Sequence, residues 1–231
     1  MKSYKTNIPD VEIWYDKDNI VIISKNKLEC LSNAAINGGR LATKSIVNHH
    51  VPLNFNKKQL KEELNPVKYK YNLPDNMIGL LTAVKMKDAI IINNNINKVD
   101  YTLILTAGLT NTSIPLIEDS NQYEYNHYTY DNPGTINIIL LINAKLSEHA
   151  LVNLFIIITE IKTYLLKLLN IQTQDGKPAT GTSTDTIVIG FTNKSQYIEW
   201  SGSSTKFGQS IGSTIFATLE RALKKKGYYL I

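Results

Sequence analysis

The sequence predicts a mixed α/β (α+β) protein that forms a single domain over residues 1–231. Three observations support this prediction. The first half of the chain consists largely of short β-branched and aromatic runs, whereas the second half contains two long segments with apolar residues at helical spacing. Continuous apolar runs in the second half alternate with these segments, which is typical of helices that cover a sheet. No Pro-, Gly- or Ser-rich linker divides the chain.

Composition narrows the class of protein. Hydrophobic residues make up 43% and charged residues 19% of the chain, which favours a globular fold over disorder. The single cysteine, Cys30, excludes an intrachain disulfide and a cysteine-built metal site, and a reducing cytoplasm is the expected location. We expect neither a signal peptide nor a membrane helix, because no apolar stretch approaches the length of about 18–20 residues that a span needs.

The net charge of +5 raises the possibility of nucleic-acid binding. The lysines are scattered, however, and the one tight cluster, Lys224-Lys225-Lys226, lies where a helix is expected to end. Lysines at that position complement the helix dipole without any partner. We therefore predict no nucleic-acid partner and no membrane partner, and the sequence leaves the oligomeric state open.

The first half is predicted to be mostly β, with one short helix. The expected strands cover residues 11–15, 20–24, 28–31, 80–83, 89–92 and 103–108. The helix is expected over 57–64, ended by Asn65-Pro66, and residues 93–95 are expected to turn. The small polar segment 32–39 ends in Gly38 and Gly39, which allow a positive φ or a close backbone approach, although an ordinary turn is an alternative.

The second half is predicted to contain strand–helix units. Residues 136–142 and 186–191 are buried strands, and Ser147 is an N-cap for a long, central helix whose apolar stripe extends to Leu168. A last helix is expected over about 208–226, with Gly227 at its C-terminal end and Gly208 and Gly212 allowing close packing. The tyrosine-rich segment 118–133 is predicted to be a long loop. Its tyrosines could cover a flat ligand, but a plain surface loop is the favoured alternative.

The segment Ala179-Thr180-Gly181-Thr182-Ser183-Thr184-Asp185 is unusual because four hydroxyls, a glycine and a carboxylate directly precede a buried strand. Hydroxyls and exposed backbone N–H groups can hold a polar ligand or an oxyanion, and Asp185 could act as a base. The alternative is a Ser/Thr-rich connection in which Asp185 caps backbone groups.

Glu160 and Lys162 lie at the two edges of the apolar stripe of the long helix. Glu160 has no basic residue three or four positions away, so no local ion pair explains it. A carboxylate at a buried edge without a local partner is a candidate site residue, and a solvated glutamate is the alternative.

Six motifs occur in an order that resembles one enzyme family. They are Asn37-Gly38-Gly39, Leu81-Thr82-Ala83, Thr106-Ala107-Gly108-Leu109-Thr110-Asn111, Gly134-Thr135-Ile136-Asn137, Thr159-Glu160-Ile161-Lys162 and the segment 179–185. Together they resemble the adenosylcobinamide amidohydrolases, the CbiZ-type corrinoid salvage enzymes. Ile161 and Ser183 depart from the family pattern, where alanine and glycine are more usual, but neither change removes a charged or hydroxyl group.

The resemblance implies a reaction. Such enzymes hydrolyse the amide between aminopropanol and the corrin propionate of adenosylcobinamide, giving adenosylcobyric acid and 1-amino-2-propanol for cobalamin salvage. Cobalt belongs to this substrate, so no protein cofactor is expected. The order of elements over 134–191 is also similar to part of the self-cleaving aminopeptidases related to ornithine acetyltransferase, which suggests a layered α/β sandwich by fold-level analogy.

We hypothesise that the loop before the last strand and the long helix surround the scissile amide. Glu160 or Asp185 would activate water or a threonine hydroxyl, and Lys162 would protonate the amine or hold a carboxylate. The predicted catalytic residues are Glu160, Lys162, Thr182, Thr184 and Asp185. The predicted substrate-binding residues are Asn33, Asn37, Gly38, Gly39, Thr106, Asn111, Thr180 and Gly181.

Other interpretations remain open at this level. A protein that binds a corrinoid without cleaving it, or a hydrolase of another small amide, would need the same pocket. No metal site is predicted, because His49 and His50 are adjacent and His127 and His149 stand alone. Cys30 is a weak nucleophile candidate, because a free cysteine in an apolar run is usually inert.

Overall fold

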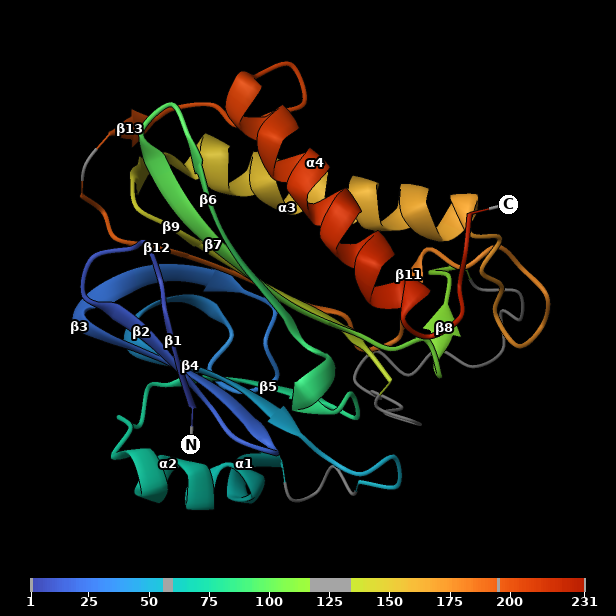
Figure 1. Ribbon diagram of the computed structural model, residues 1–231, viewed down its shortest axis with the longest axis horizontal. Coiled ribbons are helices and arrows are strands. Elements are labelled where there is room, and N and C mark those ends of the chain that lie inside the picture. Colours follow the sequence, from blue (N-terminus) through green and yellow to red (C-terminus); the bar gives the residue numbers. More distant parts are fainter. Residues whose placement is uncertain (1, 56–59, 117–133, 195, 231) are drawn as a thin grey trace.

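A computed structural model describes residues 2–55, 60–116, 134–194 and 196–230 (Figure 1). Its main element is one nine-stranded sheet. The strands of this sheet are β1 (Lys2–Lys5), β2 (Val11–Tyr15), β3 (Asn19–Ser32), β4 (Gly39–His50), β5 (Ile78–Thr82), β6 (Ile90–Ile96), β7 (Val99–Ala107), β9 (Ile136–Ile142) and β12 (Thr186–Phe191). Two small sheets join β8 (Thr112–Ser113) to β11 (Gly181–Thr182) and β10 (Lys145–Leu146) to β13 (Tyr197–Ile198).

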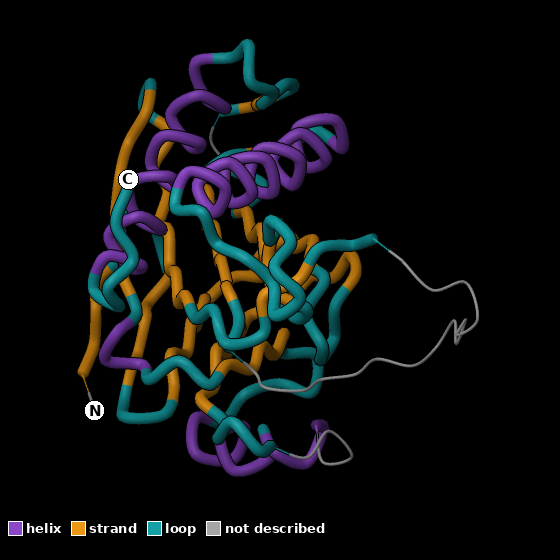
Figure 2. Tube along the Cα trace, turned by 90° about the vertical axis from the view of Figure 1, so that its right-hand side faces the viewer, coloured by secondary structure: helices purple, strands orange, loops and turns teal. Residues whose placement is uncertain are grey.

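The helices are α1 (Leu60–Glu63), α2 (Asn65–Tyr71), α3 (Glu148–Leu168) and α4 (Lys206–Lys224), with a 3₁₀ turn, η2, over Met86–Asp88. Both long helices lie on one side of the sheet, and the short α1 and α2 lie on the opposite side of the molecule (Figures 1 and 2). No helix in the described part of the chain is long and apolar enough to span a membrane. The mixed α+β class that the sequence predicts is therefore confirmed.

The long strand β3 makes the sheet curl. Along one edge it pairs first with β2 and then with β12, and along the other edge it pairs with β4, with a register shift between Ile23 and Leu28. A bulge of this kind bends a strand and increases its twist. The two halves of the sheet therefore face each other, and side chains such as Ile22, Ile46 and Leu141 fill the space between them.

Four layers follow from this curl. A second apolar cluster lies between the β7–β9–β12 half and helices α3 and α4, and a third lies between β4 and α2. All seven residues of β9 are buried, because this strand has an apolar layer on each side. The layered α/β sandwich that the order of elements suggested agrees with this arrangement.

The predicted N-cap of α3 and C-terminal end of α4 agree with the structure. The Ser147 hydroxyl accepts a hydrogen bond from Ala150 N, which caps α3. At the end of α4, Gly227 takes a φ of +89° and its N–H bonds to Lys224 O, while Tyr228 N bonds to Leu223 O. This pattern is a Schellman motif. A Cβ on Gly212 would lie 3.4 Å from Ile161 of α3, so the glycines of α4 do permit close packing.

Several boundaries were predicted wrongly. Asn93, Asn94 and Asn95 belong to β6 rather than to a turn, and the hairpin turns at Asn97 and Lys98, both with positive φ. Asparagine disfavours strands, but here the Asn95 amide donates to Asp100 on the facing strand, and the Asn93 carbonyl accepts from Thr102. The predicted strands 20–24 and 28–31 are one strand, β3, and β1 and β4 were not predicted.

Pro66 does not end the helical segment. It stands in the first turn of α2, where its missing N–H costs nothing. The predicted loop 118–133 and its tyrosines lie outside the described residues, as do residues 57–59 of the first predicted helix.

Candidate active site

The carboxylate of Asp185 is the centre of a compact polar cluster. Its Oδ1 accepts hydrogen bonds from the Thr182 hydroxyl at 2.5 Å and from Ile136 N at 3.0 Å. Its Oδ2 accepts from Lys162 Nζ at 2.5 Å and from Thr182 N at 3.0 Å. Four donors thus converge on one carboxylate, which fixes its position before any substrate arrives.

Lys162 reaches this carboxylate from the sheet-facing side of α3. Both side chains are 11% exposed, so the ion pair lies in a poorly solvated place. Gly181 makes the approach possible, because a Cβ there would lie 2.7 Å from Lys162 Nζ and would also meet Asp185 Oδ2. The loop needs glycine at this position to let the ammonium group pass.

A chain of buried polar groups runs from this ion pair into the sheet. The Thr182 hydroxyl lies 3.4 Å from that of Thr135, which lies 3.5 Å from Asn137 Oδ1. Asn137 donates to Asn48 Oδ1 at 2.9 Å and to Leu81 O at 3.1 Å. Asn48 in turn donates to Thr106 at 3.1 Å. Buried amides are stable only with such partners, so this network fixes the strands relative to one another.

The curl of the sheet explains why these residues meet. β9 and β12 run parallel and start side by side, with Thr186 opposite Asn137, and the antiparallel β7 ends there, with Thr106 opposite Asn137. The curled half brings Leu81, at the end of β5, to the same point. Two glycines permit this crowding, since a Cβ on Gly108 would lie 3.3 Å from Gly134 Cα and one on Gly134 would meet Thr110.

Asn33 and Asn111 anchor the loop that carries Asp185. Asn33 donates to Asp185 O at 2.8 Å and accepts from Ile187 N at 2.7 Å, which ties the loop to the end of β3. The Asn111 amide donates to the hydroxyls of Ser183 at 2.9 Å and Thr184 at 3.2 Å. Within the described residues, the buried Asn111 Oδ1 has no hydrogen-bond partner.

A polar cavity of about 330 Å³ opens beside this loop. Asn111, Ser183 and Thr110 form one side of it, and the turn around Asp175 forms another. The cavity can accept a short polar chain, whereas a tetrapyrrole ring would have to remain outside.

The structure brings most of the predicted site residues together. Lys162, Thr182 and Asp185 are in direct contact, and Asn33, Asn111 and Thr184 bond to the same loop. Thr180 O accepts from Thr163, which holds the loop against α3. Thr106 lies at the far end of the buried network.

Residues of the segment 32–39 make contacts in two different places. Gly39 has a φ of +90° and pairs with Ser32, next to Asn33, so it lies at the same strand ends as the site. A Cβ on Gly38 would lie 3.1 Å from Ala34 N, which confirms the close backbone approach. The Asn37 amide instead donates to Asp75 O and Met77 O, so its contacts fasten the loop to the segment before β5.

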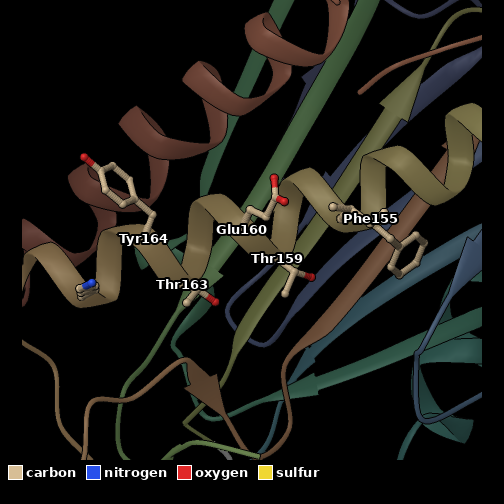
Figure 3. Close-up of a pocket in the computed structure, with 7 residues that line it drawn as sticks. Phe155, Thr159, Glu160, Thr163 and Tyr164 are labelled. Carbon is tan, nitrogen blue, oxygen red and sulfur yellow. The ribbon is translucent and has the colours of Figure 1, made fainter. Parts of the chain in front are cut away.

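Glu160 is not part of this cluster, and its expected position at a buried edge is wrong. Its side chain is exposed on α3, where it borders a hollow lined by residues of that helix (Figure 3) and a groove lined mainly by residues of α3 and α4. Positions two apart on a helix point in different directions, so burying Lys162 against Asp185 turns Glu160 outward. α3 is also less central than predicted, because Val152, Ile156 and Leu168 are exposed.

Three network residues were not predicted as site residues. Asn48, Thr135 and Asn137 are each at most 1% exposed. For Thr135 and Asn137 the sequence did offer a signal of a site, because these polar residues begin an otherwise apolar run. Asn48 lies in β4, which the sequence did not reveal as a strand, so nothing indicated that it would face Asn137.

Cys30 is an unsuitable nucleophile. Burial, and then the neighbouring charge of Glu29, raise the pKa of its thiol to about 12, so it stays protonated at neutral pH. In the part of the chain that the structure describes, no three His, Cys, Asp or Glu residues are grouped as metal ligands would be.

Comparisons with known proteins identify the family. The family model described as adenosylcobinamide amidohydrolase matches residues 1–228. The chain belongs to the adenosylcobinamide amidohydrolase family. The family resemblance seen in the sequence is therefore confirmed, and the protein is an enzyme that hydrolyses an amide.

Two archaeal proteins are similar to this chain over most of its length. An adenosylcobinamide amidohydrolase of Methanosarcina mazei is 31% identical over 224 residues, covering 93% of this chain and 98% of the relative. An uncharacterized protein of Methanocaldococcus jannaschii is 30% identical over 225 residues, covering 90% of this chain and 86% of the relative. Among solved structures, a Pyrococcus horikoshii protein aligns over 97% of this chain and 80% of its own, with a TM-score of 0.42 and 11% identity.

Proposed function

We propose that the protein hydrolyses the amide that joins aminopropanol to the corrin propionate of adenosylcobinamide. The products would be adenosylcobyric acid and 1-amino-2-propanol, and the first would re-enter cobalamin synthesis. The family membership supports the substrate class. The single observation that supports the chemistry is the 2.5 Å hydrogen bond from the Thr182 hydroxyl to the buried Asp185 carboxylate.

This contact pairs a nucleophile with a base. In the proposed first step, Thr182 Oγ1 attacks the amide carbonyl carbon while its proton passes to Asp185 Oδ1. The tetrahedral intermediate then expels the amine, which takes that proton and leaves as aminopropanol. Water attacks the resulting ester, gives a proton to Asp185 and releases the carboxylic acid, and the proton returns to Thr182.

Lys162 acts through Asp185. Its ammonium group contacts Oδ2, on the opposite side of the carboxylate from the Thr182 hydroxyl, so the carboxylate is oriented with Oδ1 toward Thr182. Of the two roles expected from sequence, holding a carboxylate fits this geometry better than protonating the amine. Lys162 is therefore a positioning residue.

The polar cavity beside the loop is the proposed position of the aminopropanol arm. An arm with a hydroxyl and an amide N–H matches the Ser183 and Thr110 hydroxyls that line the cavity. A small shift of the Asn111 side chain would also give a donor to its Oδ1, which has no partner among the described residues. The corrin ring, which carries the cobalt, would lie over the mouth of the cavity.

The decisive experiment is incubation of the purified protein with adenosylcobinamide, followed by mass-spectrometric detection of 1-amino-2-propanol. We expect release that continues over many turnovers. An acid quench during turnover should reveal a corrinoyl adduct on the Thr182 peptide. Binding of the corrinoid without release of aminopropanol would instead indicate a carrier. Cleavage of other small amides in a panel as readily as of adenosylcobinamide would indicate a general amidase.

Thr182→Val removes the proposed nucleophile but keeps the shape of the side chain. The matched control is Thr163→Val, which removes a half-buried hydroxyl that bonds to the same loop at Thr180 O. Hydrolysis at the normal rate in Thr182→Val would refute the nucleophile and leave the reaction itself standing.

A further inference from the structure

A second cavity, of about 580 Å³, is lined by lysines. Its walls come from β1, the β2–β3 hairpin, the end of β4 and the segment around η2. The residues that line it are Lys2, Tyr15, Asp16, Lys17, Asp18, His50, Lys85 and Lys87. None of these side chains takes part in the hydrogen-bond network around Asp185. We call this site the lysine-lined cavity.

The four lysines of this cavity carry charges that the described protein does not neutralise. Lys2, Lys17, Lys85 and Lys87 are all exposed, and none forms an ion pair with a carboxylate in the described ranges. They come from three separate segments of the chain, so their grouping is a product of the fold. Like charges held around one cavity repel one another unless an anion occupies it.

The two aspartates of the cavity do not cancel this charge. Burial alone would raise the pKa of Asp16, but hydrogen bonds from Lys70, Asn19, Asp18 N and Tyr71 outweigh it and hold the pKa below its usual range. The Asp16 charge is thus matched by Lys70, at 2.5 Å from Oδ2. Asp18 alone remains against four lysines.

His50 adds a hydrogen-bonding group that the described part of the protein leaves unused. It is half-buried at the end of β4, and its Nδ1 is buried without any hydrogen-bond partner among the described residues. The neighbouring His49 contrasts with it, since both of its ring nitrogens have partners, Asn19 at 2.7 Å and Glu63 at 3.3 Å. With Nδ1 uncommitted, no partner on that side fixes the tautomer of the His50 ring, and Nε2 can donate to a ligand.

We propose that the lysine-lined cavity binds an anion with two or more phosphate groups. Lysine ammonium groups are point-charge partners for phosphate oxygens, and several of them around one cavity suit a ligand with several charges. A cavity of 580 Å³ exceeds what a single phosphate would fill, but it accommodates a diphosphate or triphosphate chain. Free pyrophosphate and a nucleoside triphosphate share this chemistry.

Isothermal titration calorimetry on the full chain tests the proposal, with inorganic pyrophosphate, inorganic triphosphate and ATP as three separate ligands. We expect pyrophosphate to bind with a dissociation constant below about 1 mM in 50 mM salt, and more weakly at 300 mM salt. Tighter binding of ATP than of inorganic triphosphate would assign the site to a nucleotide, and equal binding would assign it to the phosphate chain alone. Absence of binding by all three would overturn the proposal.

Lys85→Gln combined with Lys87→Gln should weaken pyrophosphate binding at least tenfold. The matched control is Lys27→Gln with Lys44→Gln, which removes two exposed lysines near the β3–β4 register shift and should change binding less than twofold. Equal losses in the two double variants would mean that only net charge matters, and would refute a defined site.

His50→Gln provides an independent measurement. In the normal protein, pyrophosphate should shift the ¹⁵N resonances of one histidine ring, and this shift should be missing in the His50→Gln spectrum. A histidine spectrum that pyrophosphate leaves unchanged would contradict the role of His50. The amide-cleavage assay is not used in any of these tests, so the binding proposal and the proposed function succeed or fail separately.

Discussion

The Asp185 cluster and the lysine-lined cavity contain similar side chains but differ in how their charges are satisfied. Around Asp185, one carboxylate receives four donors, including the Lys162 ammonium group, and both charged side chains are nearly buried. In the lysine-lined cavity, four exposed ammonium groups have no carboxylate partner within the described chain.

This difference reflects two uses of charge. A buried charge must be paired, because removing it from water costs several kcal/mol, and the pairing gives a rigid, preorganised group. An exposed charge keeps its hydration, so leaving it without a partner when no ligand is bound costs little free energy. The first arrangement suits a group that takes part in a reaction, and the second suits reversible binding. Four sets of variants test the contrast.

The largest effect is expected for Asp185→Asn. It leaves the Lys162 ammonium group buried without a counter-charge, so the free energy of unfolding should fall by about 3–5 kcal/mol, and hydrolysis should be lost. Urea unfolding measures the first and aminopropanol release the second. The double variant Lys162→Met with Asp185→Asn removes the unpaired ammonium group and keeps an acceptor oxygen for the Thr182 and Ile136 donors, so it should regain most of the stability but no activity. The control Asp18→Asn, in the lysine-lined cavity, should change stability by less than about 0.5 kcal/mol.

Thr182→Val should separate activity from stability. Loss of the hydroxyl removes the proposed nucleophile, so the turnover rate should fall by about 10²–10⁴-fold. The free energy of unfolding should change by only about 1 kcal/mol, since one hydrogen bond is lost. Thr182→Ser keeps the hydroxyl and should retain measurable turnover. If Thr182→Val unfolds as readily as Asp185→Asn, the hydroxyl is mainly structural.

Lys85→Gln should have a small effect of the opposite sign on stability. Removing one of four like charges relieves repulsion, so the melting temperature should rise by about 1 °C or less at low salt. The rise should disappear at 1 M NaCl, where such repulsion is screened. A clear fall in melting temperature would mean that Lys85 has a stabilising partner, which would break the contrast between the two regions.

The smallest effect is expected for Glu160→Gln. The sequence alone made Glu160 a candidate catalytic residue, which would imply a large loss of turnover. Its exposed position on α3, away from the Asp185 carboxylate, predicts turnover within about threefold of normal and a stability change below about 0.5 kcal/mol. A hundredfold loss of turnover would restore Glu160 to the site.

Glu160 and Lys162 show what helical periodicity can predict and what it cannot. Their spacing placed both at the edges of an apolar stripe, but periodicity cannot say which edge faces the sheet. That choice depends on α4, which packs along α3 through Gly208 and Gly212, and on Asp185, which draws Lys162 inward. Similarly, Asn93 to Asn95 have a low intrinsic preference for strands, and cross-strand partners on β7 outweigh it.

The sequence by itself determined the mixed α+β class, the Ser147 cap of α3, the Gly227 end of α4 and the buried strands β9 and β12. These features depend on residues close together in the chain, whose periodicity and turn chemistry act locally. Only the tertiary structure decided that β3 bends the sheet and brings Asn48, Thr106 and Asn137 together, and that four distant lysines surround one cavity. Such contacts join residues that are distant in sequence. They depend on a bulge and a curl of the sheet, which no local sequence pattern encodes.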